Sequence, residues 1–155
     1  MISPELLRYY PYFSRLDEAQ LIKVAIISDE ESFENGAVIF QEGDIANALY
    51  FLLDGQVDLY YTLAGKKNSP LEKGIPVGEI NPGEPFGISA LIEPYMLTAT
   101  SSVYGSARVI KIDASELRTM FDEDRRLAYF FIHQAAKAAI ERLHATRIQL
   151  AAAWA

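Results

Sequence analysis

The chain has 155 residues, half of them hydrophobic, which is enough for one domain with a buried core and too short for two comfortable ones. The 14 basic residues are outnumbered by 21 acidic ones, and the net charge of -7 opposes binding to the phosphate backbone of nucleic acids. The absence of cysteine excludes disulfides, thiolate metal sites and a cysteine nucleophile. No apolar run reaches the length of about 18 to 20 residues that spans a bilayer. The first ten residues contain no signal-peptide core, so we expect a soluble, cytoplasmic protein without a membrane partner.

Residues 1–34 predict short N-terminal helices. Asp17 is followed three residues later by Gln20, the spacing of a capping box at a helix start. Pro11 interrupts any helix that runs through it, so two short pieces are expected. The acidic stretch Asp29–Glu34 lacks the alternation and closing glutamate of a calcium loop and is typical of a solvated connection.

Residues 35–113 predict strands joined by turns. All 9 glycines lie in this zone, at intervals expected of an all-β barrel or sandwich. Asp54-Gly55 predicts a tight hairpin between two strand-like runs, after which Val57, Leu59 and Tyr61 are expected on the core face. The apolar run at residues 49–53 before it is typical of a central strand covered on both faces, and residues 64–74 predict a polar, mobile loop.

Residues 114–155 predict helices. Ser115, or Asp113 before it, can cap a short helix that extends through Met120. From Arg125 onward the chain is rich in strong helix formers and contains neither glycine nor proline. A long C-terminal helix is therefore expected, and the whole chain is predicted to form one domain.

The segment at residues 36–60 resembles the opening strands of the cyclic-nucleotide-binding domain family. It reads GAVIFQEGDIANALYFLLDGQVDLY, with the family's order of glycine, apolar pair, Gly-Asp, apolar strand and glycine. Residues 9–21 look like the family's N-terminal helices, and residues 80–92 look like the entry to its phosphate-binding cassette, placed here at 83–100. The resemblance implies a mainly β fold, a jelly-roll barrel of the cyclic-nucleotide-binding type with flanking helices and a long C-terminal helix. It also implies a sensor domain like that of the catabolite activator, which passes a binding signal to that helix.

The cassette departs from the family pattern at both of its polar anchors. Binding members have Phe-Gly-Glu and, nine residues after the glutamate, an arginine; the glutamate holds the ribose hydroxyl and the arginine pairs with the cyclic phosphate. Here the glutamate position is Ile88 and the arginine position is Leu97. The ligand-binding residues implied by the resemblance are Phe86, Gly87, Ile88, Ser89, Ala90, Leu91, Leu97, Thr98 and Ala99.

Three interpretations of the cassette follow from these replacements. The pocket has collapsed with Ile88 and Leu97 as core, or it binds a different and more apolar ligand, or it still binds cyclic AMP or cyclic GMP weakly. Backbone N–H groups at the start of a short helix over residues 88–91 favour an anion. Arg108, Lys66 and Lys67 are the basic side chains weighed as substitutes for the missing arginine, and no cofactor is certain.

The long helix carries a stripe of apolar and small residues with heptad spacing. Because regulators of this family pair the equivalent helix across a two-fold axis, the stripe predicts a homodimer with an interface at Ile132, Ala136, Ala139, Leu143 and Leu150. The alternative is that the stripe packs on the chain's own barrel, although Leu127, Tyr129, Phe130 and Phe131 already offer a second apolar surface.

No pattern indicates catalysis or metal binding. His133 and His144 are about 16 Å apart along one helix, too far to share a metal, and no serine has the setting of a nucleophile elbow. Direct DNA binding is not expected, since no recognition helix follows the long helix. We therefore expect a non-enzymatic, ligand-sensing regulatory domain with lost or altered cyclic nucleotide binding, or alternatively a scaffold that dimerises and meets a protein partner.

Overall fold

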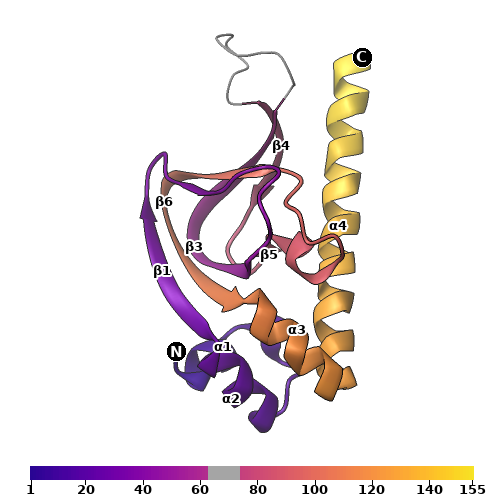
Figure 1. Ribbon diagram of the computed structural model, residues 1–155. Coiled ribbons are helices and arrows are strands. Elements are labelled where there is room, and N and C mark those ends of the chain that lie inside the picture. The colour runs from indigo at the N-terminus through magenta and orange to yellow at the C-terminus, as the bar shows by residue number, and fades with distance from the viewer. Residues whose placement is uncertain (63–73) are drawn as a thin grey trace.

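The computed structural model describes residues 1–62 and 74–155, and all structural statements concern these ranges. An antiparallel β structure is flanked by helices from both ends of the chain (Figure 1). The strands are β1 (Ser28–Glu34), β2 (Val38–Phe40), β3 (Ala48–Tyr61), β4 (Ile75–Ile80), β5 (Pro85–Phe86) and β6 (Thr100–Asp113). They pair in the order β1-β6-β3-β4, with β2 on β6 and β5 on β3. The predicted fold class, mainly β with flanking helices, is confirmed.

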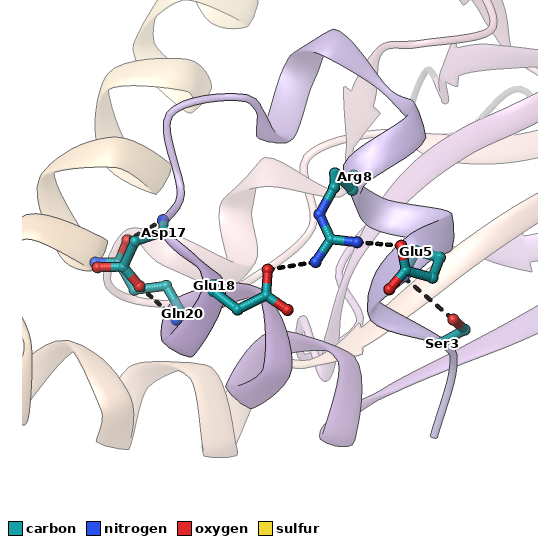
Figure 2. A network of polar contacts seen from close by, with 6 residues as sticks. All are labelled: Ser3, Glu5, Arg8, Asp17, Glu18 and Gln20. Carbon is teal, nitrogen blue, oxygen red and sulfur yellow. Dashed lines mark hydrogen bonds and ion pairs between the residues drawn. The ribbon is translucent and has the colours of Figure 1, made fainter.

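The N-terminal segment forms α1 (Pro4–Tyr9), the 3-10 helix η1 (Pro11–Phe13) and α2 (Glu18–Ile26). Pro11 separates α1 from η1 as predicted, and Asp17 and Gln20 form the predicted capping box, with bonds of 2.8 and 3.0 Å. Arg8 of α1 pairs with Glu5 on its own helix and with Glu18 on α2 (Figure 2). This network ties the first two helices together outside the core.

The helical zone ends earlier than the predicted boundary at residue 34. Residues 28–34 form β1, which pairs antiparallel with β6 along its whole length. The solvated connection predicted at Asp29–Glu34 is therefore wrong. The cross-strand partners explain the acidic composition, because Glu30 and Glu31 form ion pairs with Arg108 and Lys111 on β6 at 3.1 and 3.5 Å.

The hairpin predicted at Asp54-Gly55 is also wrong. Strand β3 continues through both residues and stays paired with β6, with register shifts next to Asp54 and Gly55. Gly55 has the positive φ expected, +93°, but Asp54 does not, so the chain makes a bulge instead of a type I′ turn. A Cβ at Gly55 would lie 1.9 Å from the carbonyl oxygen of Ser106, so only glycine fits against β6.

The core lies between the strands and the helices that cover one end of the barrel. Residues 49–53 are buried on both faces of β3, as predicted. After the bulge, Val57 is buried and Leu59 is partly buried, whereas Tyr61 is exposed, so the predicted inward face holds only for its first two residues. Aromatic rings from η1 contact the strand, since Phe13 and Phe51 lie 5.1 Å apart between ring centroids.

The C-terminal helices are α3 (Ala114–Glu123) and α4 (Arg125–Trp154). Asp113 caps α3 by accepting from the Glu116 N–H at 2.9 Å, and the helix continues three residues beyond the predicted end at Met120. Figure 1 shows α1, α2 and α3 gathered at one end of the barrel while α4 runs along its side. Tyr129 is exposed and does not join the buried surface expected of it, which Leu127, Phe130 and Phe131 supply.

The loop predicted at residues 64–74 lies outside the described residues except for Gly74, which directly precedes β4. Within the described ranges, none of the helices is both long enough and apolar enough to traverse a lipid bilayer.

Candidate functional site

A cavity of about 240 Å³ lies where the cassette faces α4. Six of the nine predicted site residues line it, namely Gly87, Ile88, Ser89, Leu97, Thr98 and Ala99. The barrel adds Phe40 and Leu59, and α4 adds Ala139 and Arg142. The cavity is smaller than the range of about 300–1,000 Å³ typical of drug-sized ligand pockets. It therefore suits a compact molecule.

The three remaining predicted residues belong to the core rather than to the cavity lining. Phe86, Ala90 and Leu91 are buried in the core and do not line the cavity. The Phe86 ring stacks on Tyr50, with 5.1 Å between centroids. Burial raises the pKa of the Tyr50 phenol to about 12, and Glu31 adds to the shift, so this ring is a neutral packing partner at physiological pH.

Gly87 sets the direction of the short helix η2 (Ile88–Leu91), which it precedes. Its φ of +68° is left-handed, and a Cβ there would meet the Tyr50 ring at 3.2 Å and the Ala48 carbonyl oxygen at 3.4 Å. Only glycine satisfies both restraints without displacing its neighbours. The structure therefore explains the Phe-Gly start of the cassette through packing alone.

The two residues predicted at the anchor positions of the cassette, Ile88 and Leu97, both line the cavity. Ile88 is partly buried at the start of η2, and the side chain of Leu97 is buried. The backbone of Leu97 is fixed on both sides, since its N–H donates to the Asp44 carbonyl at 2.9 Å and its carbonyl accepts from the Gly43 N–H at 2.8 Å. Open space thus remains beside both aliphatic side chains, neither of which carries a charge.

The basic residues considered as substitutes do not occupy the cavity. Arg108 pairs with Glu30 on the β1 edge of the sheet, so its proposed movement into the cassette is not what the structure shows. Lys66 and Lys67 lie outside the described residues. The cationic side chain that lines the cavity is instead Arg142 of α4, which sequence reasoning missed because nothing local places this turn of the helix against the cassette.

Arg142 is partly buried, and within the described part of the chain its side chain forms one hydrogen bond, to a neutral group. One guanidinium nitrogen donates to the carbonyl oxygen of Pro85, near the start of the cassette, and the Nε is buried with no hydrogen-bond partner among the described residues. Burial lowers the pKa of this guanidinium, while Glu84 and Glu141 act in the opposite direction with less effect. The cavity thus contains an arginine that is under-compensated by its surroundings.

A second arginine holds the cassette from its outer side. Arg118 of α3 donates to the Ala90 carbonyl at the end of η2 at 2.8 Å, and its guanidinium lies 4.1 Å from the centroid of the Tyr95 ring. Arg118 is not among the residues that line the cavity. Both C-terminal helices therefore contact the cassette through an arginine bonded to a backbone carbonyl.

Most residues of the predicted dimer seam on α4 are exposed to solvent. Ile132 is partly buried against the core, whereas Ala136, Ala139, Leu143 and Leu150 are exposed. An apolar groove of about 240 Å³ runs between η2 and this part of α4, lined among others by Ile92, Ile132 and Ala136. The alternative, in which the stripe packs on the chain's own barrel, applies to Ile132 only.

The domain combines an antiparallel β structure with a cavity beside η2, the short helix that follows Gly87, and a long helix, α4, that lines the same cavity. This combination is typical of ligand-binding regulatory domains. Residues 30–124 match the family described as Cyclic nucleotide-binding domain. A crystal structure from Geobacter metallireducens GS-15, of a protein described as cyclic nucleotide-binding, is 38% identical with a TM-score of 0.80, covering 93% of this chain and 100% of that one. The chain therefore belongs to the cyclic nucleotide-binding domain family, and the predicted fold of that type is confirmed.

More distant relatives place the same domain in larger proteins. The cAMP-dependent protein kinase regulatory subunit of Schizosaccharomyces pombe is 31% identical over 100 residues, which cover 64% of this chain and 22% of that protein. The regulatory domain of Toxoplasma gondii PKA, solved with cAMP, has a TM-score of 0.69 at 20% identity, covering 88% of this chain and 48% of that one, and shows the shared fold. The chain spans about a quarter of the length of the curated relatives it matches, 27% and 22%.

Proposed function

We propose that this chain is a ligand-sensing, non-catalytic regulatory domain in which cyclic nucleotide binding is weakened or altered relative to family members with both anchors. The observation that supports the proposal is the lining of the cavity, which includes Ile88 and Leu97. The sequence resemblance assigns these two residues to the positions of the sugar-binding carboxylate and the phosphate-binding guanidinium. Removing one partner of a buried charge pair costs about 2–5 kcal/mol. At about 1.4 kcal/mol per decade, this corresponds to roughly thirty-fold to several-thousand-fold weaker binding.

The proposed signal runs from the cavity to α4. The cavity is lined by the cassette on one side and by Ala139 and Arg142 of α4 on the other. A ligand that fills it contacts both elements and therefore has a different affinity for each position of the helix relative to the barrel. This difference in affinity is what allows a ligand to shift a conformational equilibrium.

Calorimetric titration with cyclic AMP and cyclic GMP tests the proposal. The expected affinity of the native chain is millimolar or weaker. The double variant Ile88→Glu plus Leu97→Arg restores both anchors, and we expect it to bind at least tenfold more tightly, since one regained charge-assisted contact is worth more than about 1.4 kcal/mol.

A matched control places the same two charges outside the cavity. Ile92 and Ile45 are both exposed, and neither lines the cavity. Ile92→Glu plus Ile45→Arg is therefore expected to leave nucleotide affinity at the native level. Micromolar affinity of the native chain for either nucleotide contradicts the proposed weakening.

We also propose that the domain dimerises through α4. The exposed stripe at Ala136, Ala139, Leu143 and Leu150 and the apolar groove beside it support this proposal, since a second helix would cover both. The same surface favours the alternative function, a scaffold that meets a partner without sensing a ligand. A thermal-stability screen of metabolites separates the two, because only the sensor requires a stabilising compound.

A further inference from the structure

The charge distribution of the cavity differs from that expected of a cassette that has merely lost its arginine. Arg142 lines the cavity from α4, whereas Leu97 lines it from the segment between η2 and β6. Among residues 1–62 and 74–155, no carboxylate oxygen lies within 4.0 Å of it. A cation whose Nε is buried and whose one hydrogen bond within the described residues goes to a neutral carbonyl is costly unless another charge compensates it.

We infer that Arg142 is the residue that holds the negatively charged group of the ligand, in place of the cassette arginine that Leu97 replaces. This inference rests on the proposed ligand-sensing function and adds to it the residue and the chemical class of the ligand. The buried Nε without a partner supports it, because native structures leave few such groups unsatisfied and those few call for an explanation.

The rest of the lining describes the ligand. Ser89 and Thr98 offer hydroxyl groups, and Ile88, Leu97 and Leu59 offer apolar surface. No acidic residue lines the cavity among the described residues. One cation beside an apolar wall suits a compact organic anion, with a single phosphodiester or carboxylate group next to an apolar body.

The position of Arg142 also links the charge of a bound ligand to the contact between α4 and the cassette. In the structure its guanidinium bonds to the carbonyl of Pro85, two residues before Gly87. An anion in the cavity competes with this carbonyl, and ion pairs with a guanidinium are stronger than its bonds to neutral oxygens. Binding therefore replaces a contact between α4 and the cassette entry by a contact between α4 and the ligand.

The test uses the full chain and two probes, cyclic AMP as the phosphodiester and hexanoate as the carboxylate. Binding is followed by calorimetry for the native chain, Arg142→Gln, Arg142→Lys and the control Arg118→Gln. The control removes the other arginine that bonds to a cassette carbonyl but does not line the cavity. It therefore reports the structural cost of losing such a contact.

We expect the native chain to bind one of the two probes, and Arg142→Gln to lower that affinity at least tenfold, as the loss of a buried charge contact of more than about 1.4 kcal/mol requires. Arg142→Lys should retain part of the affinity, since lysine keeps the positive charge but cannot form the bidentate hydrogen bonds of a guanidinium. Arg118→Gln should stay within about twofold of the native chain, a change of under roughly 0.5 kcal/mol. Adding Leu97→Arg to Arg142→Gln should restore binding of the phosphodiester from the cassette side.

Equal binding by Arg142→Gln and the native chain overturns the inference and leaves the proposed function standing. An equal loss in Arg142→Gln and Arg118→Gln also overturns it, because it assigns Arg142 a structural role. If neither anion binds but an uncharged metabolite stabilises the chain, the inference is also overturned and the proposed sensing function stands. Failure of every compound removes the proposed sensing function and the inference with it.

Discussion

The two halves of α4 meet different surroundings, although they form one uninterrupted helix. The first half, residues 125–139, buries a stripe against the rest of the domain that consists of Leu127, Phe130, Phe131, Ala135 and Ala138. The second half, residues 140–154, extends along the barrel (Figure 1) and leaves large apolar side chains exposed, from 49% for Leu143 to 84% for Trp154. Its contacts include a bond of 3.4 Å from the Gln149 amide to the Pro76 carbonyl.

This contrast shows which interactions hold each half in place. The first half is stabilised by burial within its own chain, whereas an isolated helix of about 12–15 residues is marginal in water. The second half thus depends on continuity with the first and on whatever covers its apolar side chains. Arg142 lies at the junction, where the helix leaves the core and reaches the cassette.

The largest expected effect comes from the buried half. Phe131 is fully buried, with ring centroids 5.0 Å from Phe130 and 5.8 Å from Phe121. Phe131→Ala removes this packing and leaves a cavity, so we expect a loss of about 3–5 kcal/mol in the free energy of unfolding. Urea denaturation followed by circular dichroism measures it. Ile148→Ala in the exposed half is the control and should change stability by less than about 0.5 kcal/mol; similar losses in both variants would remove the distinction between the halves.

The second prediction concerns what covers the exposed half. If α4 pairs with a second copy, Leu143→Glu places a charge in the seam, and we expect the dimer dissociation constant to rise at least tenfold, about 1.4 kcal/mol or more. Sedimentation equilibrium at several concentrations measures it. Ala145→Glu, two residues along and pointing to another side of the helix, should leave association unchanged. A native chain that is monomeric at tens of micromolar contradicts the dimer itself.

The sequence predicted those features whose causes are local. Asp17 with Gln20, and Asp113 with the helix it caps, satisfy backbone groups within three residues, so their spacing alone is informative. The positive φ at Gly55 was also predictable, but its consequence depends on β6, which continues past it and converts a turn into a bulge. The cassette residues were located by their order along the chain, and six of the nine line the cavity.

Arg142 could not be located in this way. Its contact with Pro85 joins residues 57 positions apart, and the two meet only because α4 lies along the barrel beside β5. Helical periodicity placed the apolar stripe of α4 but gave no sign of which barrel element it faces. A cavity-lining residue on a distant helix, such as Arg142, therefore cannot be found from the cassette motif, whereas the departures from that motif at Ile88 and Leu97 can be read directly from the sequence.

The smallest predicted effect on stability is at the start of the buried half, where Asp124 connects α2 to α4. Its carboxylate accepts from the Leu127 N–H at 3.1 Å, capping α4, and from the Gln20 amide of α2 at 3.0 Å. Asp124→Ala removes both bonds, and we expect a loss of about 1 kcal/mol, as for other helix caps. Chemical denaturation at neutral pH measures this loss.

The pH dependence separates the charge of Asp124 from its capping geometry. The hydrogen bond from Gln20, followed by that from the Leu127 N–H, lowers the pKa of this carboxyl in the folded chain. Because the pKa of an aspartate in the unfolded chain is about 3.9, this stabilisation is present above that pH and is lost as the pH falls through the lower folded value. Asp124→Asn keeps an oxygen that can cap the helix but cannot titrate. Denaturation is measured at a series of pH values from neutral to below about pH 4, and the stability difference between the native chain and Asp124→Asn should shrink as the pH falls. A difference that stays constant would mean that the carboxylate charge does not stabilise this half of α4.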